Sequence, residues 1–225
     1  MKEYIKSYHL ILSTKALRIV MYLYPVISIF FAGIMALLFT SVDDAELIPM
    51  ALVFGGNLFV SVEVILVCCV WLGITSKESA AMEYVKTSVK WIPVLKKILL
   101  MDMIRRNAGI ILCLSLAALL LREAVNPGYA VTTIILTILF TEAGTGVAKR
   151  AKSLTFSATL LIMLVTEGIF ALVAGFLMAF SDTNVPWIFA AAGVLVIILL
   201  TWMNIRMIMK RVKDGYYDCR NKKDS

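Results

Sequence analysis

Charged residues are scarce in this chain of 225 residues, because Asp, Glu, Lys and Arg make up only 16% of it. Soluble domains carry about 25% charged and roughly 45–50% apolar residues. Here the apolar fraction is 61% and the mean hydropathy is +0.90. A soluble core of this size cannot bury so much apolar surface, whereas a bilayer can surround it. The composition therefore excludes an ordinary soluble domain and predicts an all-α, polytopic membrane protein.

Residues and motifs that carry chemistry are equally scarce. The chain has one His and no cluster of His with acidic residues, which argues against a metal site. The run from Gly144 to Lys149 lacks the spacing and the hydroxyl residue of a phosphate-binding loop. The four cysteines form no disulfide framework, since Cys68, Cys69 and Cys113 fall within apolar runs. We predict no catalytic residue, metal or cofactor, and we expect no enzymatic activity in this chain.

Apolar stretches are what the sequence has in abundance. Six of them approach or exceed the roughly 20 residues that a helix needs to cross a bilayer, although the third is short. Together they predict one transmembrane domain over residues 1–225, whose spans cover residues 19–40, 47–74, 104–122, 128–148, 154–181 and 185–207.

The basic residues are distributed unevenly around these spans. All but one of the 22 Lys and Arg residues fall before span one, between spans two and three, between spans four and five, or after span six. Arg122 is the exception. Arg105 and Arg106 are counted with the segment before span three, since the uncharged part of that span begins only at Asn107 and both arginines fall at its edge. Cytoplasmic connections are rich in Lys and Arg, so we predict a cell-membrane protein with both termini in the cytoplasm. The net charge of +7 then reports topology, and no nucleic-acid partner is expected.

Two segments outside the spans have helical periodicity. Apolar residues recur at helical spacing in residues 1–14, which predicts an amphipathic helix lying in the membrane interface. In the longer segment 77–106, apolar residues also recur about once per turn until Pro93, which disfavours a continuing helix. We expect one helix, a turn at 91–93, and a second helix leading into span three. The segment either rests on anionic headgroups or docks a cytoplasmic partner.

Glu63 and Glu167 lie near the centres of their predicted spans, where a charged side chain costs about 2.5 kcal/mol or more. No Lys or Arg is expected at a matching depth, so we expect neither carboxylate to have an ion-pair partner. Each would be protonated or hydrogen-bonded, for example by Asn57 or Ser61. The alternatives are a neutral structural hydrogen bond and a substrate path lined by Glu63, Glu167 and Asn57, which would suit cationic or amphipathic cargo. Glu142 lies nearer a span end, where it could snorkel.

Small residues at helical spacing predict close helix packing inside the membrane. Gly168, Ala171 and Gly175 share one face of span five, Gly144 and Ala148 share a face of span four, and residues 190–193 form a small patch on span six. Packing within the chain is the ordinary interpretation, and a contact between two copies is the alternative.

The interfacial N-terminal helix, the six spans and the elaborate segment between spans two and three resemble the permease subunit of a type-2 ABC exporter, in its small bacterial six-span form. The resemblance is most specific at residues 77–97, where residues 83–88 fit the short coupling helix of that family. It implies that this helix docks into a separate ATP-hydrolysing subunit, and that two permease subunits pair as a homodimer or heterodimer. It also implies export of a peptide, a lipid or a drug. The residues implied in docking are Glu83, Tyr84, Lys86 and Lys90.

Four other functions compete with the exporter. A substrate-capture subunit of a vitamin importer needs a small-residue surface on an early span, but the small residues here come late. A proton-coupled secondary transporter using Glu63 or Glu167 usually has inverted repeats and interrupted helices, which the sequence does not show. An immunity or accessory membrane protein and a membrane enzyme of unknown type remain as further alternatives.

Overall fold

Helices form all the regular secondary structure in the described part of this computed structural model, which covers residues 15–41, 48–75, 91–150 and 156–221. In chain order they are α2 (Lys15–Ser41), α3 (Met50–Thr75), α5 (Trp91–Leu120), α6 (Pro127–Arg150), α7 (Phe156–Met178) and α8 (Val185–Asn221). The last five are long and apolar enough to cross a membrane. The chain is therefore an all-helical, multi-pass membrane protein, as the composition predicts.

The first predicted span, which corresponds to α2, is not among the five helices that are long and apolar enough to cross a membrane. Within α2 the apolar stretch Leu23–Leu38 is shorter than in the other five helices, so the sixth span stays a prediction. The predicted interfacial helix (residues 1–14) and the predicted coupling helix (residues 80–90) lie outside the described residues.

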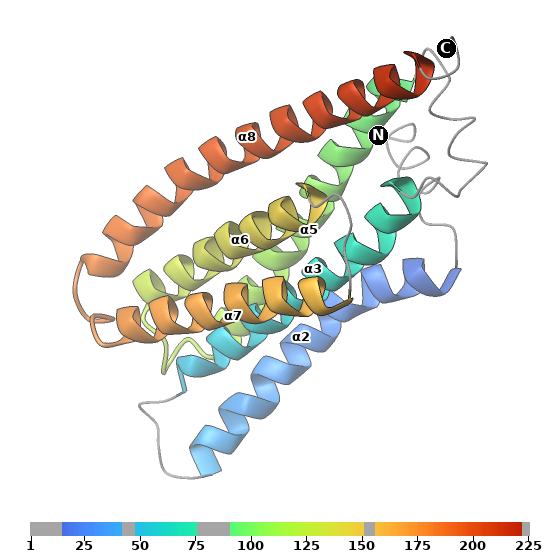
Figure 1. Ribbon diagram of the computed structural model, residues 1–225. Helices are drawn as coiled ribbons and strands as arrows, with labels where there is room; N and C mark the ends of the chain where they lie inside the picture. Colours follow the sequence, from blue (N-terminus) through green and yellow to red (C-terminus); the bar gives the residue numbers. More distant parts are fainter. Residues whose placement is uncertain (1–14, 42–47, 76–90, 151–155, 222–225) are drawn as a thin grey trace.

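Consecutive helices run in alternating directions, so that α2, α5 and α7 begin at the end of the bundle where α3, α6 and α8 finish (Figure 1). We call this the basic end, because the sequence places Lys and Arg at these helix termini. Its members on the helices are Lys15, Arg18, Lys96, Lys97, Lys149, Arg150, Arg206, Lys210, Arg211, Lys213 and Arg220. The opposite end carries the short connections 121–126 and 179–184, with Arg122, Glu123 and Asp182.

The helices α3 and α6 form the centre of the bundle. Within their apolar stretches 61% of the residues are buried, compared with 22% in α5 and 17% in α7 and α8. Helix α6 packs against α3, α5, α7 and α8, while α2 packs mainly against α3 and α5. In a bundle embedded in a bilayer, the outer helices expose apolar side chains to lipid while the central helices are buried by their neighbours. The arrangement of α3 and α6 inside α5, α7 and α8 agrees with this.

Glycines allow α6 to approach its neighbours closely. A Cβ atom on Gly144 would lie 2.9 Å from Cγ2 of Val64, and one on Gly193 would lie 2.7 Å from Cγ2 of Ile135. On α3, a Cβ atom on Gly56 would lie 2.6 Å from Oγ1 of Thr137 and 2.8 Å from Cζ of Phe170. The prediction of close packing by small residues is confirmed for spans four and six.

The small residues of α7 behave differently. A Cβ atom on Gly168 or on Gly175 would meet nothing within 4 Å. The buried face of α7 is instead formed by Phe170, Ala174 and Leu177. The expectation that Gly168 and Gly175 pack within the chain is therefore wrong, and the contact between two copies stays open as a hypothesis.

Helix α5 begins at Trp91 and continues without a break to Leu120. Pro93 lies in its first turn, where the missing N–H removes no intrahelical hydrogen bond. The predicted helix leading into span three is therefore confirmed, but the predicted turn at 91–93 is wrong, because these residues form the first turn of α5. The helix is about 45 Å long at 1.5 Å per residue, and it carries Arg105 and Arg106 inside the apolar stretch Pro93–Leu120. The assignment of both arginines to the segment before span three is wrong.

Candidate functional site

An ion pair joins the centres of α3 and α5. The Nη2 atom of Arg105 donates to both carboxylate oxygens of Glu63, at 2.7 Å to Oε1 and 2.8 Å to Oε2. Glu63 is fully buried, and the Tyr24 hydroxyl from α2 donates a further hydrogen bond to its carboxylate. The expectation that Glu63 has no ion-pair partner is therefore wrong. It failed because α5 begins at Trp91 and its apolar stretch Pro93–Leu120 includes Arg105, whereas the uncharged run begins only after Arg106.

A second set of ion pairs surrounds Asp102, which lies one turn before Arg105 on α5. Its Oδ2 atom accepts from Lys149 Nζ of α6 at 2.8 Å and from Arg106 Nη1 at 3.2 Å, and Arg105 Nη2 lies 3.5 Å from its Oδ1 atom. Arg106 also donates through Nη2 to the carboxylate of Glu142 on α6. Glu142 is buried, so the expectation that it snorkels is wrong.

We call these six side chains the charge network: Glu63, Asp102, Glu142, Arg105, Arg106 and Lys149. It contains equal numbers of acidic and basic groups, so its formal charges cancel. Buried charges need such pairing, because an unpaired ion in an apolar interior costs several kcal/mol. The network ties α5 to both central helices, and its side chains are at most 9% exposed.

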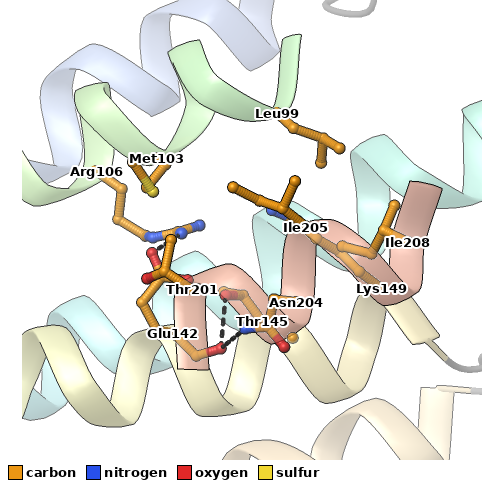
Figure 2. Close-up of a pocket in the computed structure, with 11 residues that line it drawn as sticks. Leu99, Met103, Arg106, Glu142, Thr145, Lys149, Thr201, Asn204, Ile205 and Ile208 are labelled. Carbon is orange, nitrogen blue, oxygen red and sulfur yellow. Dashed lines mark hydrogen bonds and ion pairs between the residues drawn. The ribbon is translucent and has the colours of Figure 1, made fainter. Parts of the chain in front are cut away.

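A small cavity opens beside the charge network, between α5, α6 and α8 (Figure 2). Its volume is about 20 Å³, which is room for about one water molecule. Its charged lining residues are Arg106, Glu142 and Lys149. The remaining lining residues are Leu99, Met103, Thr145, Gly146, Thr201, Asn204, Ile205 and Ile208. Asn204 of α8 donates through Nδ2 to the backbone carbonyl of Glu142 at 3.1 Å, which fastens α8 over the cavity.

Hydrogen-bonding capacity is left over at this cavity. Arg106 is 1% exposed, and its Nε atom has no acceptor among the described residues. Each carboxylate of the charge network, in contrast, has at least one cationic partner.

Glu167 lies apart from the charge network, at the contact between α3 and α7. The structure gives a hydrogen bond between its carboxyl group and the Ser61 hydroxyl. The same Ser61 oxygen lies 2.8 Å from the backbone carbonyl of Asn57. A hydroxyl carries only one hydrogen, so both contacts are satisfied if Glu167 is protonated and donates to Ser61. Within the described ranges no Lys or Arg forms an ion pair with Glu167.

The predicted path residues are thus only partly brought together. Asn57 and Ser61 share one face of α3 at helical spacing, and the Oδ1 atom of Asn57 is buried without a partner among the described residues. Glu63 projects from the other side of α3, toward α2 and α5, where Tyr24 and Arg105 occupy its carboxylate. One path lined by both glutamates does not follow from this arrangement.

The structure adds residues that sequence reasoning did not select: Tyr24, Asp102, Arg105, Arg106 and Lys149. The spacing of Asp102 from Arg105 and Arg106 is i, i+3 and i+4, which places all three on neighbouring positions of a helix. That signal was present, but it points to a buried network only once the helix is known to continue from Trp91. The predicted docking residues Glu83, Tyr84, Lys86 and Lys90 lie in the undescribed segment 76–90. Comparison of the chain with protein-family models, curated proteins and solved structures finds no match.

Proposed function

We propose that this chain is the membrane-spanning subunit of an ATP-driven exporter of the type-2 ABC class, with ATP hydrolysed by a separate partner subunit. The cargo class is a peptide, a lipid or a drug-like molecule. Two permease subunits, identical or different, form the complete membrane unit. The chain resides in the cell membrane as a six-span protein, with its basic end and both termini in the cytoplasm.

The observation that carries this proposal is the way the charge network ties α5 to the central helices. Helix α5 follows directly after segment 76–90, where the coupling helix is expected. Arg105 pairs with α3 through Glu63, and Arg106 pairs with α6 through Glu142. A displacement applied to the start of α5 by a partner would therefore be passed to both central helices. Such a connection is what a membrane unit driven from outside the bilayer needs.

The charge distribution supports the proposed orientation. Lys and Arg gather at the basic end, while the opposite end has short connections with Glu123 and Asp182. Basic residues are retained on the cytoplasmic side of short connections. Since segment 76–90 follows the end of α3, it would emerge on the same side as an ATP-hydrolysing subunit.

The test is co-purification of the full-length tagged chain from its native cell, followed by mass spectrometry and an ATPase assay. We expect an ATP-binding subunit to co-purify and to be lost when Glu83, Lys86 and Lys90 are all changed to Ala. The matched control changes Arg122, Glu123 and Asp182 to Ala, which alters the same number of charges at the opposite end. A chain that purifies in folded form without any ATPase would refute the proposal.

A proton-coupled secondary transporter is the second candidate, and Glu167 is the observation that favours it. Its carboxyl group lies half-way along α7, next to Ser61 and without an ion pair to any described cation. The variant Glu167→Gln keeps the size and the hydrogen bond but cannot release a proton. Unchanged transport in this variant agrees with the ATP-driven proposal, whereas loss of transport at normal expression would favour proton coupling.

A further inference from the structure

Helix α8 presents one continuous row of side chains to the outside of the bundle, and we call this row the outer stripe. Its members are Leu195, Leu199, Trp202, Arg206 and Lys210, which follow one another at spacings of three or four residues and so share one helix face. All five are exposed, whereas the buried residues of α8 lie on the opposite face, which packs against α6. Figure 1 shows α8 along an outer edge of the bundle. The outer stripe therefore faces lipid when the bundle lies in a bilayer.

The length of the uncharged part of α8 sets the depth of the outer stripe. The 21 residues from Val185 to Ile205 carry no charge, and they span about 32 Å at 1.5 Å per residue. This is close to the ~30 Å thickness of the hydrocarbon layer. Trp187 and Trp202 lie within about one turn of the two ends of this run and are 49% and 58% exposed, as expected of aromatic residues at the two membrane interfaces. Arg206 is then the first charged residue of α8 beyond the hydrocarbon, at the level of the lipid headgroups.

Beyond this boundary the outer stripe is cationic. The sequence has four basic residues from Arg206 to Lys213 and no carboxylate before Asp214. The guanidinium carbon of Arg206 lies 5.1 Å from the ring centroid of Trp202, a cation–π contact that holds the cation next to the apolar boundary. Neither Arg206 nor Lys210 forms an ion pair with a carboxylate in the part of the chain that the structure describes. Both side chains are thus available to an anion at the membrane surface.

The combination of apolar, aromatic and cationic side chains in one row decides which anion fits. A basic residue near the bilayer surface favours anionic over neutral lipid by roughly fivefold. A phospholipid matches the whole row, with its headgroup at Arg206 and Lys210, its glycerol region at Trp202 and an acyl chain along Leu199. A soluble anion would match only the two cations, and a cytoplasmic protein could not cover the part of the row that lies in hydrocarbon. The connection before α8, residues 181–184, carries Asp182 and no basic residue, so the other end of the helix has no such site.

We propose that the outer stripe of α8 is a binding site for an anionic phospholipid in the leaflet at the basic end. Arg206 and Lys210 donate to the phosphate oxygens and neutralise the headgroup, because guanidinium and ammonium groups bind such oxygens strongly. Trp202 and Leu199 contact the start of the acyl chain. The site uses only the outer face of α8 and no member of the charge network, so it does not depend on the proposed transport function.

The test uses the full chain in phosphatidylcholine vesicles, with Trp202 as a fluorescent reporter. Trp71, Trp91 and Trp187 are changed to Phe, and a lipid with brominated acyl chains is added as either phosphatidylglycerol or phosphatidylcholine. Bromine quenches a tryptophan that the lipid chain touches. We expect brominated phosphatidylglycerol to quench Trp202 with a relative affinity about fivefold or more above that of brominated phosphatidylcholine. The ratio should fall close to one when Arg206→Gln and Lys210→Gln are combined.

Two controls separate this site from a general attraction of lipid to a basic protein. Arg122→Gln removes a basic residue at the opposite end and should leave the ratio at Trp202 unchanged. A second reporter chain keeps Trp187 and carries Phe at the other three tryptophans, and it should show no preference between the two lipids. Native mass spectrometry of the chain with all four tryptophans gives a second measurement. From an equal mixture of the two lipids it should retain more phosphatidylglycerol, and the excess should disappear in the variant that combines Arg206→Gln with Lys210→Gln.

Equal quenching of Trp202 by the two lipids would overturn the proposal, as would a preference that survives the combined substitution of Arg206 and Lys210. A preference of the same size at Trp187 would also overturn it, because the attraction would then belong to the whole membrane surface and not to the outer stripe. The result is separable from the ATPase test, since neither outcome of that test changes the expected quenching of Trp202.

Discussion

Changing Glu63 to Gln tests the central claim that the charge network holds the bundle together. The substitution keeps the shape of the side chain and removes its charge, leaving the buried guanidinium of Arg105 without its closest carboxylate. Removing one partner of a buried ion pair costs about 3–5 kcal/mol. Asp102 lies 3.5 Å from the same nitrogen and retains part of the compensation, so we expect a loss near the lower limit, about 3 kcal/mol. This corresponds to roughly a hundredfold change in the unfolding equilibrium constant.

The double variant Glu63→Gln with Arg105→Gln separates the ion pair from a general loss of packing. Once both charges are gone, no buried ion remains uncompensated at this position, and replacing a whole buried pair is often nearly neutral. We therefore expect the double variant to be more stable than Glu63→Gln alone. The interaction energy from the double-mutant cycle should be about 2 kcal/mol, within the range found for residues in direct contact.

The assay is reversible unfolding of the full chain in mixed detergent micelles, followed by tryptophan fluorescence and circular dichroism. The control is Glu123→Gln, an exposed position in the connection between α5 and α6, where a change within about 0.5 kcal/mol is expected. If Glu63→Gln unfolds like this control, or if the two substitutions in the double variant simply add, the proposed role of the ion pair is wrong.

Two other substitutions test the packing and the second carboxylate. Gly56→Ala should destabilise the fold by about 1–3 kcal/mol, because its Cβ atom would lie 2.8 Å from the fully buried ring of Phe170. The matched control is Gly168→Ala, which should be neutral because its Cβ atom would meet nothing within 4 Å. Equal effects of the two substitutions would contradict the packing around Gly56. Glu167→Gln should change the free energy of unfolding by less than about 1 kcal/mol in the same assay, since an amide can replace a protonated carboxyl as the donor to Ser61. A loss of stability comparable to that of Glu63→Gln would show that Glu167 is charged and paired.

The fold class could be predicted from composition, because apolar runs of about 20 residues are long enough to cross a bilayer, and in lipid such a run satisfies its backbone hydrogen bonds as a helix. The close approach at Gly144 also followed from its spacing with Ala148. Gly168 and Gly175 are seven positions apart and also share a helix face, but a Cβ atom on either would meet nothing within 4 Å. Spacing defines a shared face of a helix, and it does not say which neighbour that face meets.

The charge network was missed for a related reason. A search for uncharged stretches finds the third one only after Arg106, so Arg105 and Arg106 were counted at the edge of the predicted span, with the segment before it. If both arginines are placed outside the membrane, no cation is expected near Glu63. One misplaced boundary thus produced two wrong conclusions, on the position of the arginines and on the partner of Glu63. Only tertiary packing shows that residues from three helices neutralise one another, since Glu63 and Arg105 are 42 positions apart in sequence.

The order of synthesis gives the charge network a further consequence. A charged side chain at the centre of a helix raises the cost of membrane insertion by about 2.5–3.5 kcal/mol, and α5 carries Asp102, Arg105 and Arg106. When α5 leaves the ribosome, Glu63 has already been made, but Glu142 and Lys149 belong to a helix that follows. We therefore expect α5 to stay beside the insertion machinery until α6 arrives, so that the two helices enter the lipid as a pair. Truncation of the nascent chain before Glu142 should leave α5 outside the bilayer.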